Sequence, residues 1–169
     1  MIIKSVLGKK PLWGNDCFFA DTATVVGDVI IGDFCSIWFN TVIRGDVNKI
    51  RIGNNVNIQD GSVVHATYKK TSTFIGNHVS IGHNAIIHGC TIDDFVLVGM
   101  GSIVMDNSKI SSNTIVAAGS VIIENTFVEP NSIYGGIPAK KIKNIDQSKS
   151  KKEIKRIAKN YLIYSNWYK

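Results

Sequence analysis

Residues 75–104 read IGNHVSIGHNAIIHGCTIDDFVLVGMGSIV, and in this segment an Ile or Val returns every six residues, with one shorter interval before Ile92. The period extends in both directions and gives sixteen Ile or Val positions in four runs. They are Val25, Ile31, Ile37, Ile43, Ile52, Ile58, Val64, Ile75, Ile81, Ile87, Ile92, Val98, Val104, Ile110, Val116 and Ile122. Glycine often follows the aliphatic residue, because a sharp corner favours a residue without a Cβ. Six residues therefore predict one short strand and its corner.

Three such sides close a coil of about eighteen residues, and successive coils stack as parallel strands about 4.8 Å apart. Each coil then buries its aliphatic residues along a central axis. We therefore predict that residues 1–145 form an all-β domain, a parallel β-helix of hexapeptide repeats with the cross-section of a triangular prism.

Beyond Pro138 the apolar residues change to helical spacing, with lysines between them. The predicted apolar stripe consists of Ile154, Ile157, Ala158, Tyr161 and either Tyr164 or Ser165. We predict a single α-helix within residues 146–169 that packs on the outside of the β-helix.

The net charge of +6 belongs to the C-terminal part of the chain. Residues 140–169 carry ten Lys or Arg against two acidic residues, whereas residues 1–139 carry nine against eleven. The basic segment lacks a recognisable nucleic-acid-binding module, and a solvated helix face explains its charge. We therefore expect no nucleic-acid partner.

Neither the first residues, MIIKSVLGKKPLWG, nor any later run approaches the length of about 18 apolar residues that a membrane span needs. Cys17, Cys35 and Cys90 show no CxxC spacing, which favours reduced thiols over disulfides or a thiolate metal site. We expect a cytoplasmic protein without a membrane partner.

The register of the repeat places two histidines together. Three extra residues precede Ile52, five precede Ile75 and one is missing before Ile92. With these shifts, the residues that directly follow the aliphatic positions of side one form a column: Val26, Arg44, His65, His88, Met105 and Ile123. The imidazoles of His65 and His88 should stack one strand spacing apart, where two nitrogens can share one metal ion.

His83 is the third residue of side three, so it lies on a different face of the prism. It cannot comfortably reach the same ion within one subunit. If three subunits pack about a threefold axis, side three of one can face side one of the next, and His83 then completes a three-histidine site. The register therefore favours a homotrimer, whereas His78 in a repeat turn is expected to be only solvated.

The segment WFNTVIRGDVNKIRIGNNVNIQDGSVVHAT (residues 38–67), with IGHNAIIHGC, VAAGSVI and GGIPAK further on, resembles the γ-class carbonic anhydrase family of hexapeptide-repeat proteins. The resemblance covers roughly residues 10–145. It implies a left-handed β-helix and a trimer with one metal at each subunit interface. In the family pattern, His65 and His88 match the two ligands from one subunit and His83 matches the ligand from its neighbour.

The resemblance also implies roles for residues around the metal. Arg44 and Asp46 of the RGD segment, with Asp60, match a salt-bridged set at the subunit boundary. Their expected role is assembly and support of the ligands.

Gln59 matches a residue that hydrogen-bonds the metal-bound water, and Asn57 a neighbour that orients it. Alternatively, both are strand-corner amides that satisfy the backbone. Tyr161 matches a tyrosine that reaches the site, although an aromatic residue on the apolar stripe of a helix can equally be part of the core.

Three neutral imidazoles leave a coordination position open on Zn²⁺, or on Fe²⁺ or Co²⁺, and such an ion can lower the pKa of bound water to about 7. The predicted activity is the reversible hydration of carbon dioxide to bicarbonate by a metal-bound hydroxide. Two features depart from the most active family pattern. Val47 follows the RGD segment where a glutamate can stand, and the loop ATYKKTST (residues 66–73) holds lysines instead of acidic proton shuttles.

Two other functions stay open at this point. Hexapeptide β-helices also serve as trimeric acyltransferases that use coenzyme A, and a metal hydroxide could hydrolyse a thioester. A catalytically silent trimeric scaffold would retain the same fold. The three histidines favour the anhydrase over both alternatives.

Overall fold

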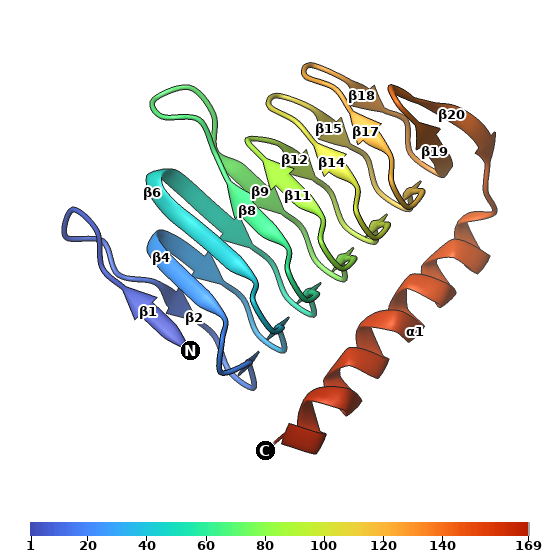
Figure 1. Cartoon of the computed structure of the whole chain (residues 1–169). Coiled ribbons are helices and arrows are strands. Elements are labelled where there is room, and N and C mark those ends of the chain that lie inside the picture. The colour runs from blue at the N-terminus through green and yellow to red at the C-terminus, as the bar shows by residue number, and fades with distance from the viewer. Residues whose placement is uncertain (169) are drawn as a thin grey trace.

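The computed structural model describes residues 1–168, except for the side chain of Lys149. The chain winds into stacked coils of short parallel strands, and one long helix runs beside them (Figure 1). The predicted fold class, a parallel β-helix with a C-terminal helix, is confirmed.

The strands lie on three sides. Side one consists of β1 (Ile2–Lys4), the first part of β4 (Thr24–Ile31), the first part of β6 (Val42–Ile52), β8 (Val63–His65), β11 (Ile86–His88), β14 (Ile103–Val104) and β17 (Val121–Ile122). Side two consists of β2 (Leu12–Trp13), the second parts of β4 and β6, β9 (Thr73–Ile75), β12 (Thr91–Ile92), β15 (Lys109–Ile110) and β18 (Phe127–Val128). Side three consists of β3 (Phe18–Phe19), β5 (Ser36–Ile37), β7 (Asn57–Ile58), β10 (Ser80–Ile81), β13 (Leu97–Val98), β16 (Ile115–Val116) and β19 (Ser132–Gly136).

The core is the column of aliphatic residues that the repeat predicts. All sixteen predicted Ile and Val positions are at most 5% exposed. Burying an Ile or Val side chain stabilises a fold by about 1.5–3 kcal/mol, so the column supplies the main driving force for coiling. Cys35 and Cys90 are buried in the same core, and all three cysteines are free thiols.

A ladder of Asn and Asp side chains holds the corners between sides two and three. The backbone N–H of Asn15 donates to Asp33 Oδ1 at 2.7 Å, and that of Asp33 to Asn54 Oδ1 at 2.8 Å. The N–H groups of Asn54 and Asn77 continue the series to Asn77 and Asp94, at 2.9 and 2.7 Å. Each side chain satisfies an amide of the preceding coil, so the corners stack in register.

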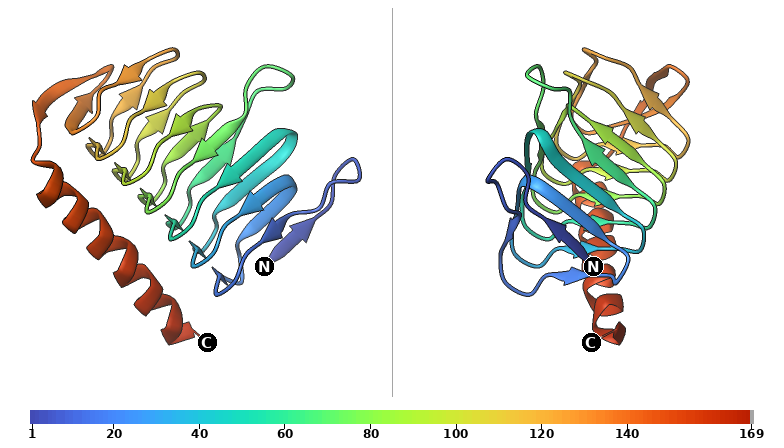
Figure 2. Two further views of the ribbon diagram at one scale, coloured as in Figure 1. Left: turned by 180° about the vertical axis from the view of Figure 1, so that it is seen from behind. Right: turned by 60° about the vertical axis from the view of Figure 1, so that its left-hand side comes forward.

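The last coil ends in a hairpin, because β20 (Ala139–Asn144) pairs antiparallel with β19. The helix α1 (Gln147–Ser165) and a 3₁₀ turn, η1 (Asn166–Tyr168), follow. Figure 2 shows that α1 runs along the outside of the coils back toward the first coil. Ile154, Ala158 and Ser165 are buried against the β-helix, as the apolar stripe predicts. No helix in the described part of the chain is long and apolar enough to cross a membrane.

The helix docks on a corner of the prism through aromatic and basic side chains. The Nζ atoms of Lys151 and Lys155 lie 4.3 and 5.5 Å from the centroid of the Phe95 ring. His78 stacks on the same ring with centroids 4.8 Å apart and an interplanar angle of 10°. The expectation that His78 is only solvated is therefore wrong, because the repeat brings Phe95 onto the corner directly beside it.

Candidate metal centre

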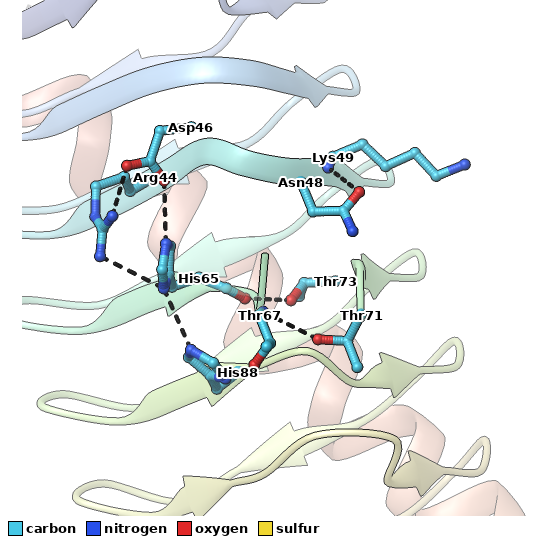
Figure 3. Close-up of polar contacts among 9 residues, drawn as sticks. All are labelled: Arg44, Asp46, Asn48, Lys49, His65, Thr67, Thr71, Thr73 and His88. Atoms are coloured by element: carbon cyan, nitrogen blue, oxygen red, sulfur yellow. Dashed lines mark hydrogen bonds and ion pairs between the residues drawn. The ribbon is translucent and has the colours of Figure 1, made fainter. Parts of the chain in front are cut away.

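His65 and His88 lie side by side on side one, as the register predicts. Strands β8 and β11 pair in parallel with His65 opposite His88, because Val64 and Ile87 point into the core and the following residues point outward. Nδ1 of His65 and Nε2 of His88 are 3.2 Å apart (Figure 3). Two nitrogens at about 2.0–2.1 Å from one zinc ion lie about 3.0–3.5 Å apart, so this pair fits a shared ion.

Arg44 and Asp46 support His65 from the preceding coil (Figure 3). Nη1 of Arg44 donates to Asp46 Oδ2 at 2.6 Å, and Asp46 Oδ1 lies 3.1 Å from Nε2 of His65. Nη2 of Arg44 also lies 3.4 Å from Nδ1 of His65. The carboxylate is thus held between a guanidinium and an imidazole.

These contacts determine the charges of Asp46 and His65. Burial by itself raises the pKa of Asp46, but hydrogen bonds from Arg44 and His65 outweigh it, so its pKa lies below the usual value. Burial and the nearby Arg44 cation lower the pKa of His65, although Asp46 opposes them. At neutral pH Asp46 is charged and His65 is neutral, which is the form of histidine that binds metals.

Asp106 supports His88 in the same way, although no sequence motif predicted this role. Its Oδ1 lies 2.6 Å from Nδ1 of His88, and Oδ2 accepts a hydrogen bond from the hydroxyl of Thr67. Hydrogen bonds from Thr67, His88 and Thr71 outweigh the effect of burial and lower the pKa of Asp106. A Cβ at Gly89 would lie 2.1 Å from Oδ1 of this carboxylate, so the corner needs a glycine. The register places Asp106 directly after Met105, one coil beyond His88, but residue spacing alone does not show that its carboxylate turns toward His88.

His83 lies on side three, after β10, with a carboxylate of its own. Its Nδ1 is 2.8 Å from Oδ2 of Asp60, and its Nε2 is 3.4 Å from the hydroxyl of Tyr161 on α1. Burial, with Asp60 and Tyr164 nearby, raises the pKa of Tyr161 to about 12, so the phenol stays protonated at neutral pH. Within one chain Asp60 is therefore paired with His83, and no contact joins it to the Arg44–Asp46 pair among the described residues.

Asn57 and Gln59 lie on side three, the side that also carries His83. Nε2 of Gln59 donates to Oδ1 of Asn57 at 2.9 Å, and Nδ2 of Asn57 donates to the Ser80 hydroxyl at 2.7 Å. Both amide side chains are at most 5% exposed. The chain thus forms two separate walls of the candidate site. The side-one wall consists of His65 and His88. The side-three wall consists of His83, Gln59 and Asn57, with Tyr161 of α1 beside them.

A single chain does not bring the three predicted ligands together. Among the residues that the structure describes, no three His, Cys, Asp or Glu side chains cluster closely enough to hold a metal ion. Each of the three histidines nevertheless has one ring nitrogen on its own aspartate and the other ring nitrogen facing away from it. A carboxylate on the far nitrogen fixes the tautomer and the orientation of a metal-binding histidine, so the donor set fits a divalent ion.

The loop after His65 lies close to the side-one wall of His65 and His88 but carries no acidic side chain. Tyr68, Lys69 and Lys70 are exposed, and Thr71 folds back so that its Oγ1 accepts the N–H of Thr67 at 3.0 Å. Val47 follows Asp46 at the neighbouring corner. Neither position offers a carboxylate that could carry protons.

The fold and the paired histidines together define a class, the hexapeptide-repeat proteins with a left-handed parallel β-helix. The solved structure of a hexapeptide transferase family protein from Anaplasma phagocytophilum is 38% identical to this chain, with a TM-score of 0.93, over 99% of this chain and 98% of that one. No protein-family model matches the sequence.

Curated relatives narrow the class. The sequence is 50% identical to the probable carbonic anhydrase of Methanocaldococcus jannaschii over 86% of this chain and 88% of that protein. It is 41% identical to gamma carbonic anhydrase 2, mitochondrial, of Arabidopsis thaliana over 95% of this chain, but it spans only 59% of that protein's length. The chain belongs to the γ-class carbonic anhydrase family.

Proposed function

We propose that three copies of the chain form a trimer in which His65 and His88 of one subunit and His83 of its neighbour hold one divalent metal ion, and that this site hydrates carbon dioxide to bicarbonate. The main observation in support of this proposal is that three histidine–aspartate pairs occupy two different sides of the prism. Side one offers two ligands and side three offers one, so the set becomes complete only when these sides of two subunits meet.

When bound by three neutral imidazoles, zinc, ferrous iron or cobalt lowers the pKa of a water molecule to about 7 and so supplies the nucleophile for carbon dioxide. The residues of the chain act around it. Asp46, Asp60 and Asp106 hold the three imidazoles in one tautomer. Gln59 and Asn57, buried beside His83, orient a water or bicarbonate by hydrogen bonds.

Tyr161 is placed to donate a hydrogen bond but not to accept a proton at neutral pH, because its pKa lies near 12. With no carboxylate at Val47 or in residues 66–73, the rate of proton export depends on bulk buffer. The proposal therefore predicts slow hydration that rises with buffer concentration.

The test combines metal analysis with stopped-flow carbon dioxide hydration on anaerobically purified protein. We expect about one metal ion per subunit and a buffer-dependent rate, with both lost in His88→Ala. His78→Asn is the matched control, because it removes a histidine from a corner outside both walls and keeps a residue that accepts a left-handed backbone. Bound metal without hydration would redirect the search to thioester substrates, and absence of metal would favour a scaffold.

Subunit complementation tests the shared interface. His83→Ala and His88→Ala should each be inactive alone, because each lacks one ligand. In a mixed trimer, side one of the His83→Ala subunit and side three of the His88→Ala subunit restore one complete site. Recovery of activity on co-refolding supports the interface, and its absence in trimers shown to be mixed contradicts it.

An acyltransferase that uses coenzyme A, or a thioesterase, is the second candidate. It is supported by the transferase name of the solved relative from Anaplasma phagocytophilum. Such an enzyme needs one histidine base, and it gives no reason for three histidines that each carry an aspartate. Assays with acetyl coenzyme A on the same preparations separate the two functions.

A further inference from the structure

A basic pocket lies on side two, beyond the loop that follows His65. Its volume is about 440 Å³, and three lysines line it together with four hydroxyl residues: Lys49, Lys70, Lys109, Thr71, Ser72, Thr91 and Ser108. Lys49 lies at the corner within β6, Lys70 lies in the loop before β9, and Lys109 begins β15, two coils further on. The loop insertion with Lys70, which the carbon dioxide chemistry leaves unused, forms one wall.

The charge of this pocket favours an anion. None of the described residues that line it is acidic. Lys109 has one exposed ion-pair partner, Asp93, at 3.5 Å, and Nζ of Lys49 lies 5.5 Å from the centroid of the Phe74 ring. Three ammonium groups around one hollow repel one another, and a multiply charged oxyanion relieves that repulsion while accepting their hydrogen bonds.

The loop wall is held in place before any ligand binds. The backbone N–H groups of Lys70 and Thr71 donate to the carbonyl of Thr67 at 3.1 and 3.2 Å, and Oγ of Ser72 lies 3.1 Å from Oδ1 of Asn48. Figure 3 shows Thr71 turned back toward Thr67 at the base of this loop. A site whose backbone is already ordered loses little entropy on binding.

We propose that this pocket binds a small phosphate monoester. A phosphate dianion matches the three lysines, and the volume exceeds that of the phosphate alone, which leaves room for an organic group against the half-exposed ring of Phe74. The pocket belongs to side two, whereas the proposed trimer uses sides one and three. It therefore stays accessible in the assembly, and its occupancy does not depend on the proposed metal chemistry.

The experiment is a calorimetric titration of the purified 169-residue chain with glycerol 3-phosphate, at constant ionic strength. We expect saturable binding of one molecule per subunit. The triple variant K49Q/K70Q/K109Q should bind at least tenfold more weakly, while the matched triple variant K140Q/K143Q/K159Q, which removes three exposed lysines elsewhere, should bind like the wild type. Circular dichroism confirms that both variants are folded, and K70Q alone should weaken binding by a few fold.

Four results would overturn the proposal. Absence of saturation, or equal loss in both triple variants, would show only diffuse charge attraction. Undiminished binding in K49Q/K70Q/K109Q would place the phosphate elsewhere, for example on a bound metal. The last measurement uses vesicles of phosphatidylcholine with phosphatidic acid. If the protein bound these vesicles but not glycerol 3-phosphate, the pocket would be a contact for a lipid surface.

Discussion

The coils of residues 42–90 and those of residues 91–128 share one core but differ in the outward column that follows the core residues of side one. In the second region the repeat is regular, and its outward positions on side one are apolar: Ile103, Met105, Val121 and Ile123. In the first region insertions interrupt the repeat, and the corresponding column carries Arg44, His65 and His88. The core therefore tolerates insertions at the corners, and the polar site is built where they occur.

The largest effect should come from the shared core. Ile87→Ala in the interrupted region and Ile122→Ala in the regular one remove fully buried side chains from the same side of the prism. Each should lower the free energy of unfolding by about 3 kcal/mol, because neighbouring coils cannot close the cavity. Chemical denaturation at equal protein concentration measures both. A difference above about 1.5 kcal/mol would mean that neighbouring coils relax into the cavity more fully in one region than in the other.

The next largest effect should come from the carboxylates that hydrogen-bond the histidines. If the proposed metal site is correct, Asp106→Ala should weaken metal binding by about 10–100-fold, because His88 loses the acceptor that fixes its tautomer. Asp106→Asn should recover part of the affinity, since an amide oxygen still accepts the imidazole N–H. Competition with a chelator gives the affinity, and ¹⁵N shifts of the His88 ring in metal-free protein report the tautomer.

Asp93→Ala is the matched control for Asp106, because the one ion pair of the Asp93 side chain in the described structure is with Lys109, an exposed lysine on side two. It should leave metal affinity and the His88 ring shifts unchanged. If Asp106→Ala behaved like this control, the carboxylate would have no positioning role.

Deleting residues 68–72 would turn the interrupted coil into a regular one. Val64 and Ile75 would then be six residues apart, as in the second region. We expect a loss of only about 1 kcal/mol, because the hydrogen bonds of Thr71 are lost while a shorter loop costs less entropy to close. Thermal denaturation tests this expectation. A fall of 3 kcal/mol or more would show that the insertion is part of the fold itself.

The smallest effect is a pH dependence at the corner that both regions share. Burial, with Lys155 and Lys151 nearby, lowers the pKa of His78 below its ordinary value, and Asp94 opposes this only in part. The unfolded chain thus takes up a proton more readily, so stability falls as the pH drops below about 6.5. We expect a loss of a few tenths of a kcal/mol by pH 5.5, discounted for partial exposure.

His78→Asn should remove this part of the pH dependence, because Asn113 occupies the equivalent corner position in the regular region. Urea denaturation at pH 7.5 and 5.5 compares the two proteins. An identical pH dependence in both would mean that His78 does not couple to the docking of α1.

The sequence by itself determined the core, the side on which each residue lies, and the stacking of His65 on His88, because strand register in a β-helix follows directly from residue spacing. Its period even continues into the first coil, where Trp13 and Phe19 take the positions that Ile and Val hold in later coils.

Only the tertiary structure decided which carboxylate serves which histidine. Asp60 joins His83, Asp106 joins His88, and Tyr161 reaches His83 from a helix 78 residues further along the chain. These contacts depend on side-chain directions across neighbouring coils and on where α1 docks. Neither is encoded in a six-residue period, which fixes the position of each Cα but not the partner of its side chain.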